Sequence, residues 1–331
     1  MPPVGLLANP MSGKDIRRVI ARASVFDNQE KQNIVRRAVA GAIAGGAREF
    51  AYMPDGYDIV SSAAEEHAGQ ATFTAVEFPD TNSALDTIRC ARHLQEVGCG
   101  AVVTLGGDGT NRAFTLGWRD VPLIPVSTGT NNVFPRMVEA TVAGAAAGLV
   151  ASGRVPLAEV ARSVKIVIAE IEGERDDLAL IDAVVLNEQF IGARAIWDPS
   201  RLRSALLTRA EPAAVGISSI GGLLEPVHDD DEEGLAIQFG GADSVLAPIA
   251  PGLYLPVPVE SYRRLPPGEI LEVVGPGVLA FDGERERVLK PGQRATLRIK
   301  RDGPRVIDVP RTLQYAARRG HFRGTGEPHG S

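Results

Sequence analysis

The sequence predicts an α/β protein in which an N-terminal doubly wound parallel α/β domain is followed by a C-terminal antiparallel β-sandwich domain. In the first half, short apolar runs that suit buried strands alternate with segments of helical periodicity, the pattern of a parallel sheet with helices on both faces. After about Pro156, β-rich runs follow one another with turns roughly every eight to twelve residues, the pattern of antiparallel sheets. We therefore expect an α/β domain over residues 1–155, a β-rich domain over 156–309, and a C-terminal tail over 310–331 that packs back or is disordered.

Strands and helices of the first half each have a local signal. The expected strands are short apolar runs, and they cover residues 4–9, 49–53, 71–78, 101–105 and 121–126. Helices are expected from residue 15 onward and over residues 29–44 and 57–67. Thr81 or Ser83 can cap the next helix, which reaches Val97. Pro135 suits the first turn of a helix that continues to residue 149.

The second half reads mainly as strands. Runs over 164–171 and 178–191 are joined by residues 172–177, which resemble a hairpin turn. The acidic run 228–234 is expected to be a solvated loop rather than a metal site. A short basic helix is expected over 310–322.

Composition excludes several classes of protein. The chain has 331 residues, a net charge of -6 and a pI near 5.5, with no basic stripe of the kind that binds nucleic acid. It contains no apolar run of roughly 18 residues or more, so no membrane span is expected. The N-terminus has no positively charged segment of a signal peptide, and the two cysteines form no CxxC pair. These features predict a cytoplasmic protein with reduced thiols.

A glycine-rich turn after the strand at 101–105 is the strongest functional signal. The turn reads Gly-Gly-Asp-Gly-Thr over 106–110, and Thr110 and Asn111 can cap a helix that begins at Arg112. Backbone N–H groups at such a turn, and the dipole of the helix after it, favour a bound phosphate. The carboxylate of Asp108 would repel bare phosphate unless a cation or a substrate proton lies beside it. This combination predicts Mg²⁺-dependent phosphoryl transfer.

Two further loops support a nucleotide site. Each follows an expected strand of the parallel sheet, and open α/β sheets bind ligands at the carboxyl ends of their strands. Any one of the three loops alone is compatible with a tight turn, whereas three on one edge favour a nucleotide cleft. The predicted nucleotide-binding residues are Asn9, Ser12, Gly13, Gly106, Gly107, Gly109, Thr110, Thr128, Gly129, Thr130 and Asn131.

The three loops together resemble a known superfamily. Asn-Pro-x-Ser-Gly at 9–13, Gly-Gly-Asp-Gly-Thr at 106–110 and Thr-Gly-Thr-Asn at 128–131 are similar to motifs of the NAD kinases and of the diacylglycerol and sphingosine kinases. Asn187 and Glu188 resemble the pair with which NAD kinases hold the substrate nucleoside, and Asp282-Gly-Glu284 resembles a motif of the lipid-kinase branch. With the opening at 5–18, the chain most resembles the acetoin-catabolism protein X group, which is described as ATP-NAD-kinase-like.

The resemblance implies a reaction and its parts. It implies ATP and Mg²⁺ as cofactors, a nucleotide cleft between the two domains, and a homo-oligomer. Asp108 would act as the catalytic carboxylate and contact Mg²⁺, and Asp282 and Glu284 would share metal or base duty. Asp282-Gly283 is equally compatible with a simple hairpin turn, and Asn187-Glu188 with a cap or a solvated pair.

Three functions stay open. The first is an ATP-dependent kinase acting on a hydroxyl group, with NAD to NADP as the leading named reaction. The second is a kinase for another small alcohol or a lipid, because residues 214–222 lack the threonines and the tyrosine of the NAD kinase substrate loop. The third is a non-catalytic nucleotide-binding regulator. Neither the acceptor nor the choice between ATP and polyphosphate as donor follows from the sequence.

Overall fold

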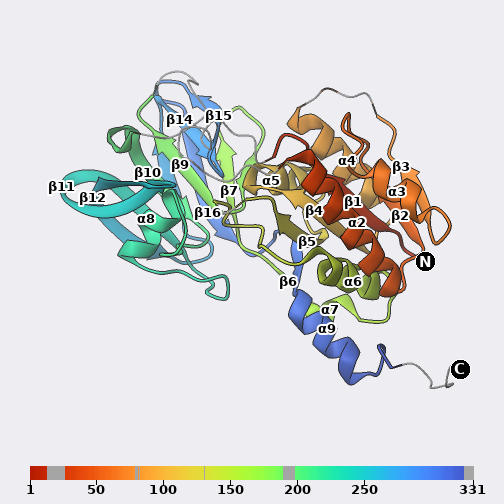
Figure 1. Cartoon of the computed structure of the whole chain (residues 1–331). Helices are drawn as coiled ribbons and strands as arrows, with labels where there is room; N and C mark the ends of the chain where they lie inside the picture. The colour runs from red at the N-terminus through yellow and green to blue at the C-terminus, as the bar shows by residue number, and fades with distance from the viewer. Residues whose placement is uncertain (13–26, 79–80, 82, 130, 189–197, 324–331) are drawn as a thin grey trace, which may run out of the picture.

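The computed structural model describes residues 1–12, 27–78, 81, 83–129, 131–188 and 198–323. The first part of the chain is built on a seven-stranded sheet with the order β3-β2-β1-β4-β5-β17-β6 (Figure 1). All neighbours pair in parallel except β6 and β17. The strands are β1 (Val4–Ala8), β2 (Glu49–Tyr52), β3 (Thr72–Ala75), β4 (Ala101–Gly106), β5 (Pro122–Ser127), β6 (Ala161–Ser163) and β17 (Arg305–Ile307).

Helices cover both faces of this sheet, so the predicted doubly wound architecture is confirmed. Apolar side chains of α2, α3, α6 and α9 share a core with one face, and those of α4 and α5 pack on the other. Helices α2 and α6 approach closely, since a Cβ atom on Gly144 would lie 1.9 Å from the carbonyl oxygen of Ala38. The helices are α2 (Asn28–Ala44), α3 (Ser61–His67), α4 (Ala84–Glu96), α5 (Asp108–Gly117), α6 (Ala140–Ala151), α7 (Leu157–Val160) and α9 (Val309–Arg318).

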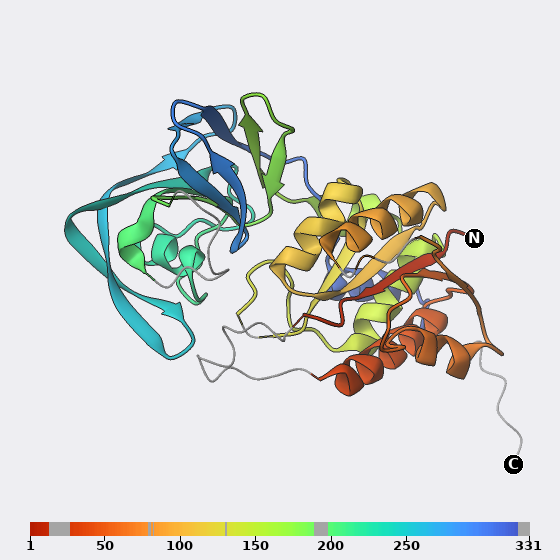
Figure 2. The ribbon, with the colours of Figure 1, turned by 90° about the horizontal axis from the view of Figure 1, so that it is seen from above.

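The second part is a sandwich of two antiparallel sheets, as predicted. One sheet has the order β12-β11-β10-β9-β14-β15 and the other the order β13-β16-β7-β8, and apolar side chains of both fill the space between them. Helix α8 (Ile217–Leu224) packs on the outer face of the larger sheet, where the long β11–β12 hairpin curves around it (Figure 2). The strands are β7 (Ile166–Ile171), β8 (Asp177–Ala179), β9 (Asp182–Leu186), β10 (Leu202–Leu207), β11 (Gly234–Ala250), β12 (Leu253–Leu265), β13 (Leu271–Val274), β14 (Gly277–Phe281), β15 (Glu284–Leu289) and β16 (Arg294–Lys300).

The two parts share a hydrophobic core. Phe114 of α5 belongs to the same buried cluster as Ile166 of β7 and Leu178 of β8. The division of the chain into domains at residues 155 and 309 stays a proposal. β6 and β17 fall within the proposed second domain, 156–309, although both strands extend the sheet of the first domain. Within the described ranges, no helix is both long and apolar enough to cross a membrane.

The helix expected to begin at Pro135 begins at Ala140 instead. The Glu139 carboxylate caps this helix by accepting hydrogen bonds from the backbone N–H groups of Thr141 and Val142. The segment before it pairs with β5, where the Arg136 N–H donates to the carbonyl of Pro125 at 3.2 Å. Backbone groups needed for a first helical turn at residue 135 are therefore already bonded elsewhere.

Other expected elements differ at their ends. The run expected over 178–191 divides into β8 and β9, because the chain passes there from the small sheet to the large one. The hairpin turn at 172–177 is confirmed, since β7 and β8 pair antiparallel. The helix expected over 57–67 begins at Ser61, and the short helix of the tail is α9. The helix expected from residue 15 and the disorder expected at the extreme C-terminus lie outside the described residues.

The acidic run 228–234 is not merely a solvated loop. Lys165, which is 1% exposed, donates from Nζ to the carbonyl oxygen of His228 at 3.0 Å. Arg209, which is also buried, forms an ion pair of 2.5 Å with Asp229. This loop therefore compensates cations that the fold has removed from water.

Candidate functional site

Three loops after neighbouring strands lie side by side at one edge of the first sheet. β1, β4 and β5 are adjacent, and Asn9, Thr110 and Thr128 lie in the segments that follow them, with Thr110 in the first turn of α5. Asn9 Nδ2 donates to Thr110 Oγ1 at 2.8 Å, and Thr128 Oγ1 donates to Ser12 Oγ at 3.2 Å. The loop after β1 is thus bonded to both of the others. Two predicted nucleotide-binding residues, Gly13 and Thr130, lie outside the described part of the chain.

A buried lysine holds the loop after β1. Lys31 of α2 is 0% exposed, and its ammonium donates to the carbonyl oxygens of Asn9, Pro10 and Ser12 at 3.0, 2.9 and 2.7 Å. Three backbone acceptors therefore surround one positive charge and fix the path of the loop. Sequence reasoning missed this residue, although it stands on the apolar face of its helix three positions before Ile34, where a charge is unusual.

Asp108 is the first residue of α5. Gly107 occupies the N-cap position, and the Asp108 carboxylate accepts hydrogen bonds from the backbone N–H groups of Val133 at 3.1 Å and Phe134 at 2.8 Å. A carboxylate in the first turn of a helix interacts favourably with the helix dipole. The side chain is consequently held between the glycine-rich turn and the loop after β5.

The expectation that Thr110 and Asn111 cap this helix is wrong. The helix begins two residues earlier, so both residues lie inside its first turns. Asn111 Nδ2 donates to the carbonyl oxygen of Gly107, and its Oδ1 accepts from Thr104 on β4. Asn111 therefore fastens the turn to the strand before it.

The glycines of the turn allow three segments to meet. A Cβ atom on Gly107 would lie 2.8 Å from Asn132 Oδ1, and one on Gly109 would lie 2.9 Å from Glu284 Oε1. At Gly106 the added atom would lie 2.6 Å from Cβ of Thr110. A side chain at these positions would displace the neighbours. Because Gly109 has none, Glu284 of β15 can lie against the start of α5.

Asp282 combines a turn with a buried carboxylate. It lies between β14 and β15 with a φ of 50°, which is the left-handed conformation of a tight hairpin. Its carboxylate is buried and accepts from the backbone N–H groups of Leu180 at 2.8 Å, Ile181 at 2.7 Å and Asp182 at 3.2 Å. The hairpin-turn interpretation is confirmed, and a share in metal or base chemistry stays a prediction.

Burial raises the pKa of Asp282 to about 7, and the negative charge of Asp108 acts in the same direction. Arg112 and the N–H groups of Leu180 and Ile181 lower the pKa. An unfolded aspartate titrates near pH 3.9, so between about pH 4 and 7 the folded protein binds a proton that the unfolded chain has lost. The free energy of unfolding therefore decreases as pH rises through this window.

We expect Asp282→Asn to remove this part of the pH dependence. Thermal unfolding of the wild type at pH 5 and pH 8 should differ by more than that of the variant, by on the order of 1 to 4 kcal/mol, since one pKa unit corresponds to about 1.36 kcal/mol. Asp302→Asn, at an exposed position, serves as the control. Equal pH dependence in all three proteins would show that Asp282 does not titrate in this range.

Arg112 ties the helix that carries Asp108 to the second part of the molecule. The guanidinium is buried, and it donates from Nε to the carbonyl oxygen of Leu178 and from Nη2 to the carboxylate of Asp177, each at 2.6 Å. It also lies over the ring of Phe281, 5.0 Å from the centroid. This contact fixes α5 against β8 and β14, and so sets the position of Asp108 relative to Asp282.

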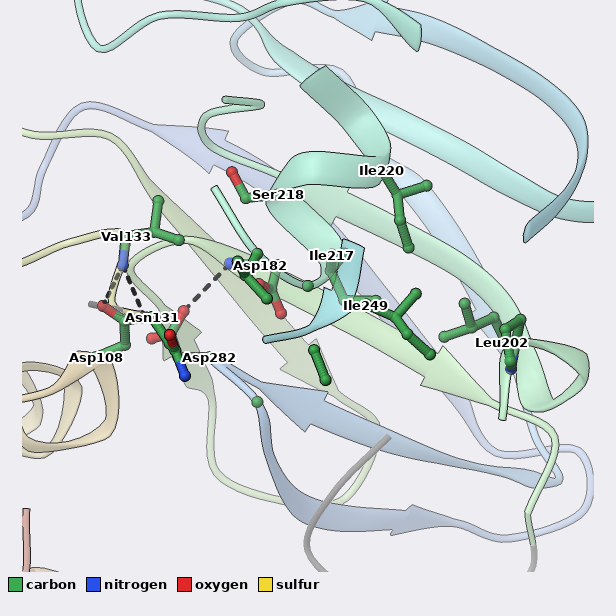
Figure 3. Close-up of a pocket in the computed structure, with 15 residues that line it drawn as sticks. Asp108, Asn131, Val133, Asp182, Leu202, Ile217, Ser218, Ile220, Ile249 and Asp282 are labelled. Carbon is green, nitrogen blue, oxygen red and sulfur yellow. Dashed lines mark hydrogen bonds between the residues drawn. The ribbon is translucent and has the colours of Figure 1, made fainter. Parts of the chain in front are cut away.

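A pocket that is partly open to solvent lies between the two parts. Asp108 and Asn131 line it from the first part, and Asp182 and Asp282 lie at the same end (Figure 3). Its other walls come mainly from apolar side chains of α8, the end of β11 and the start of β10.

Asn187 and Glu188 are not among the residues that line this pocket. They follow the far end of β9, the strand that begins at Asp182. Glu188 Oε1 forms an ion pair with Arg201 at 2.9 Å, and the Asn187 N–H donates to the Arg201 carbonyl oxygen. Their role in binding a substrate nucleoside stays a prediction.

Comparisons with known proteins agree with this architecture. The ATP-NAD kinase N-terminal domain matches residues 4–155, and the acetoin catabolism protein X C-terminal domain matches residues 165–302. Acetoin catabolism protein X of Cupriavidus necator is 40% identical over 343 aligned positions, which cover 99% of this chain and 96% of that protein.

Two solved structures align with most of the chain at low sequence identity. Yeast NADH kinase complexed with NADH aligns over 100% of this chain and 90% of its own, with a TM-score of 0.51 and 12% identity. A putative diacylglycerol kinase from Bacillus anthracis aligns over 92% of this chain and 98% of its own, with a TM-score of 0.43 and 14% identity. The chain belongs to the acetoin catabolism protein X family, within the NAD kinase-like superfamily.

Proposed function

We propose that the protein is a kinase that transfers the γ-phosphoryl group of ATP to an alcohol. The observation that carries this proposal is the meeting of three loops at the edge of the first sheet, with the Asp108 carboxylate beside them at the mouth of the pocket between the two parts. The kinase-like family supports the reaction class.

The residues present fit Mg²⁺-ATP if a single carboxylate of the protein contacts the ion. No group of three or more His, Cys, Asp or Glu side chains that could hold a metal ion occurs among the described residues. Mg²⁺ commonly needs only one or two carboxylates, because substrate phosphates and water complete its coordination. Asp108 is the carboxylate that would contact it, and the ion would neutralise charge on the phosphates.

Residues of the chain would bind the nucleotide, orient the acceptor hydroxyl and accept its proton. Backbone N–H groups of the turn over 106–110 would hold phosphate, and Asn9, Ser12, Thr128 and Asn131 would line the nucleotide. Asp108 would orient the acceptor hydroxyl and take its proton while the new O–P bond forms and the bond to the leaving ADP oxygen breaks. A free aspartate has a pKa near 3.9, far below that of an alcohol, so proton transfer must accompany bond formation.

Two acceptors are proposed. NAD is the leading named acceptor, supported by the match to the ATP-NAD kinase domain. A second candidate is a non-nucleotide alcohol, favoured because Asn187 and Glu188 lie beyond the described lining of the pocket and the wall formed by α8, β10 and the end of β11 is apolar. A nucleotide-binding regulator without turnover is the remaining alternative. For the whole molecule we expect a cytoplasmic homo-oligomer. Sedimentation of the purified protein can test the oligomeric state, and fractionation of cells can test the location.

Incubation of the purified protein with Mg²⁺-ATP and single acceptors tests the proposal. ADP release with NADP formation identifies NAD as the acceptor, and ADP release with another phosphate ester identifies an alcohol. Parallel reactions with polyphosphate define the donor, and EDTA should stop turnover with either donor. ATP binding without turnover on any acceptor would instead favour the regulator.

A further inference from the structure

We infer that the pocket between the two parts takes a neutral alcohol with an apolar body as the phosphoryl acceptor. This inference rests on the proposed function and specifies its substrate. It depends on three features of the described lining: its charge, its apolar surface, and polar groups that are already hydrogen-bonded within the protein.

Charge at the polar end of the pocket disfavours an anionic acceptor. Asp108, Asp182 and Asp282 all line this end, and the described lining includes no lysine or arginine. Two buried arginines form ion pairs with carboxylates that do not line the pocket, Arg112 with Asp177 and Arg209 with Asp229. The diphosphate of NAD would add negative charge beside these carboxylates and the ATP phosphates, whereas a neutral hydroxyl can donate a hydrogen bond to a carboxylate.

The opposite end of the pocket is apolar. Ile217 and Ile220 are three positions apart on α8, and Leu202 and Ile249 complete the wall beside them (Figure 3). Side chains of this kind stabilise hydrocarbon surface by removing it from water. The acceptor should therefore extend an apolar body away from the carboxylates.

The polar groups on the apolar wall are bonded within the protein. Ser218 Oγ donates to the carbonyl oxygen of Arg209 and accepts from the Glu211 N–H, each at 3.2 Å. The Gly216 N–H donates to the carbonyl oxygen of Pro248 at 2.9 Å. These groups have protein partners, so this wall favours hydrocarbon over a second polar group such as a nucleobase.

A series of linear primary alcohols from butanol to octanol, with glycerol and NAD, tests the inference. Binding is measured by calorimetry in the presence of a non-hydrolysable ATP analogue, and turnover by ADP release with mass detection of the ester. The dissociation constant should fall by about fourfold for each added methylene until the pocket is filled, as expected for burial of one CH₂ group. Glycerol and NAD should bind at least tenfold more weakly than hexanol.

Variants of α8 make the test specific to the pocket. Ile217→Thr introduces a hydroxyl into the wall and should weaken hexanol binding by about tenfold, with ATP affinity unchanged. Leu223→Thr is the matched control, because Leu223 lies on the same helix, is 44% exposed and does not line the pocket. Its hexanol affinity should equal that of the wild type.

The outcomes separate the inference from the proposed function. NADP formation without measurable alcohol binding would overturn the inference and leave the kinase standing. Alcohol binding that Ile217→Thr weakens, without phosphorylation of any acceptor, would support the inference about the pocket and overturn the kinase. A dissociation constant that does not change with chain length would overturn the inference even if alcohols are phosphorylated.

Discussion

Asp108→Asn is expected to lower kcat by about 10² to 10⁴-fold, the range that a positioned general base contributes. The amide keeps an oxygen that can accept a hydrogen bond from the Phe134 N–H, which Asp108 accepts at 2.8 Å in the structure. It cannot take the proton of the acceptor hydroxyl. ATP affinity should change by less than about threefold, because the backbone N–H groups of the turn remain in place.

Steady-state ADP release and calorimetric ATP binding measure these two effects separately. Asp120→Asn is the matched control, because Asp120 follows the opposite end of α5, is exposed and lies outside the pocket lining. Turnover of Asp108→Asn at the rate of the wild type would refute the role of Asp108. A comparable loss in the Asp120 variant would instead indicate damage to the helix.

Lys31→Met is expected to reduce both stability and ATP affinity. The thioether is close to the aliphatic stem in length but donates no hydrogen bond, so the carbonyl oxygens of Asn9, Pro10 and Ser12 lose their common donor. Each buried acceptor left unsatisfied costs about 1–3 kcal/mol, so the free energy of unfolding should fall by about 3 kcal/mol or more. The loop after β1 then loses its fixed path, and KM for ATP should rise by about tenfold or more.

Denaturant unfolding and ATP-dependent kinetics below the unfolding transition test this expectation. Arg37→Met, on the same helix, is the control, because its contacts with Glu30 and Glu139 lie at the surface, where ion pairs contribute little. A Lys31→Met protein that is less stable but has an unchanged KM for ATP would limit this lysine to a structural role.

The location of the three loops at one edge of the sheet could be predicted from the sequence by general rules of α/β sheets. Asn9, Asp108 and Thr128 each come directly after an apolar run, and such runs form neighbouring parallel strands whose carboxyl ends share one edge. These signals are local in the sequence. Residues 214–222 were compared with the NAD kinase substrate loop, but helix α8 was not predicted there, because Ile217–Leu224 carries four glycine or serine residues and has no side-chain cap.

Residues that act across the fold left no local signal. Arg112 meets Asp177 only after the sandwich packs on α5, and Asp182 lines the pocket with Asp108 only in the folded chain, so their spacing in the sequence carries no information about the site. Pro135 shows the opposite error, where a good local signal loses to long-range contacts. The Asp108 carboxylate binds the N–H groups of Val133 and Phe134, and this holds the chain before Pro135 in a non-helical path.

The position of β17 affects how the chain can be divided. Residues Arg305–Ile307 lie between β5 and β6, so a late segment completes a sheet that begins at Val4. A fragment ending at residue 155 would lack β17, the partner of β5 on that side, as well as β6 beyond it, and would leave unpaired backbone groups along β5. Open strands recruit other chains, so this fragment should aggregate, whereas the intact protein seals the strand with its own returning end.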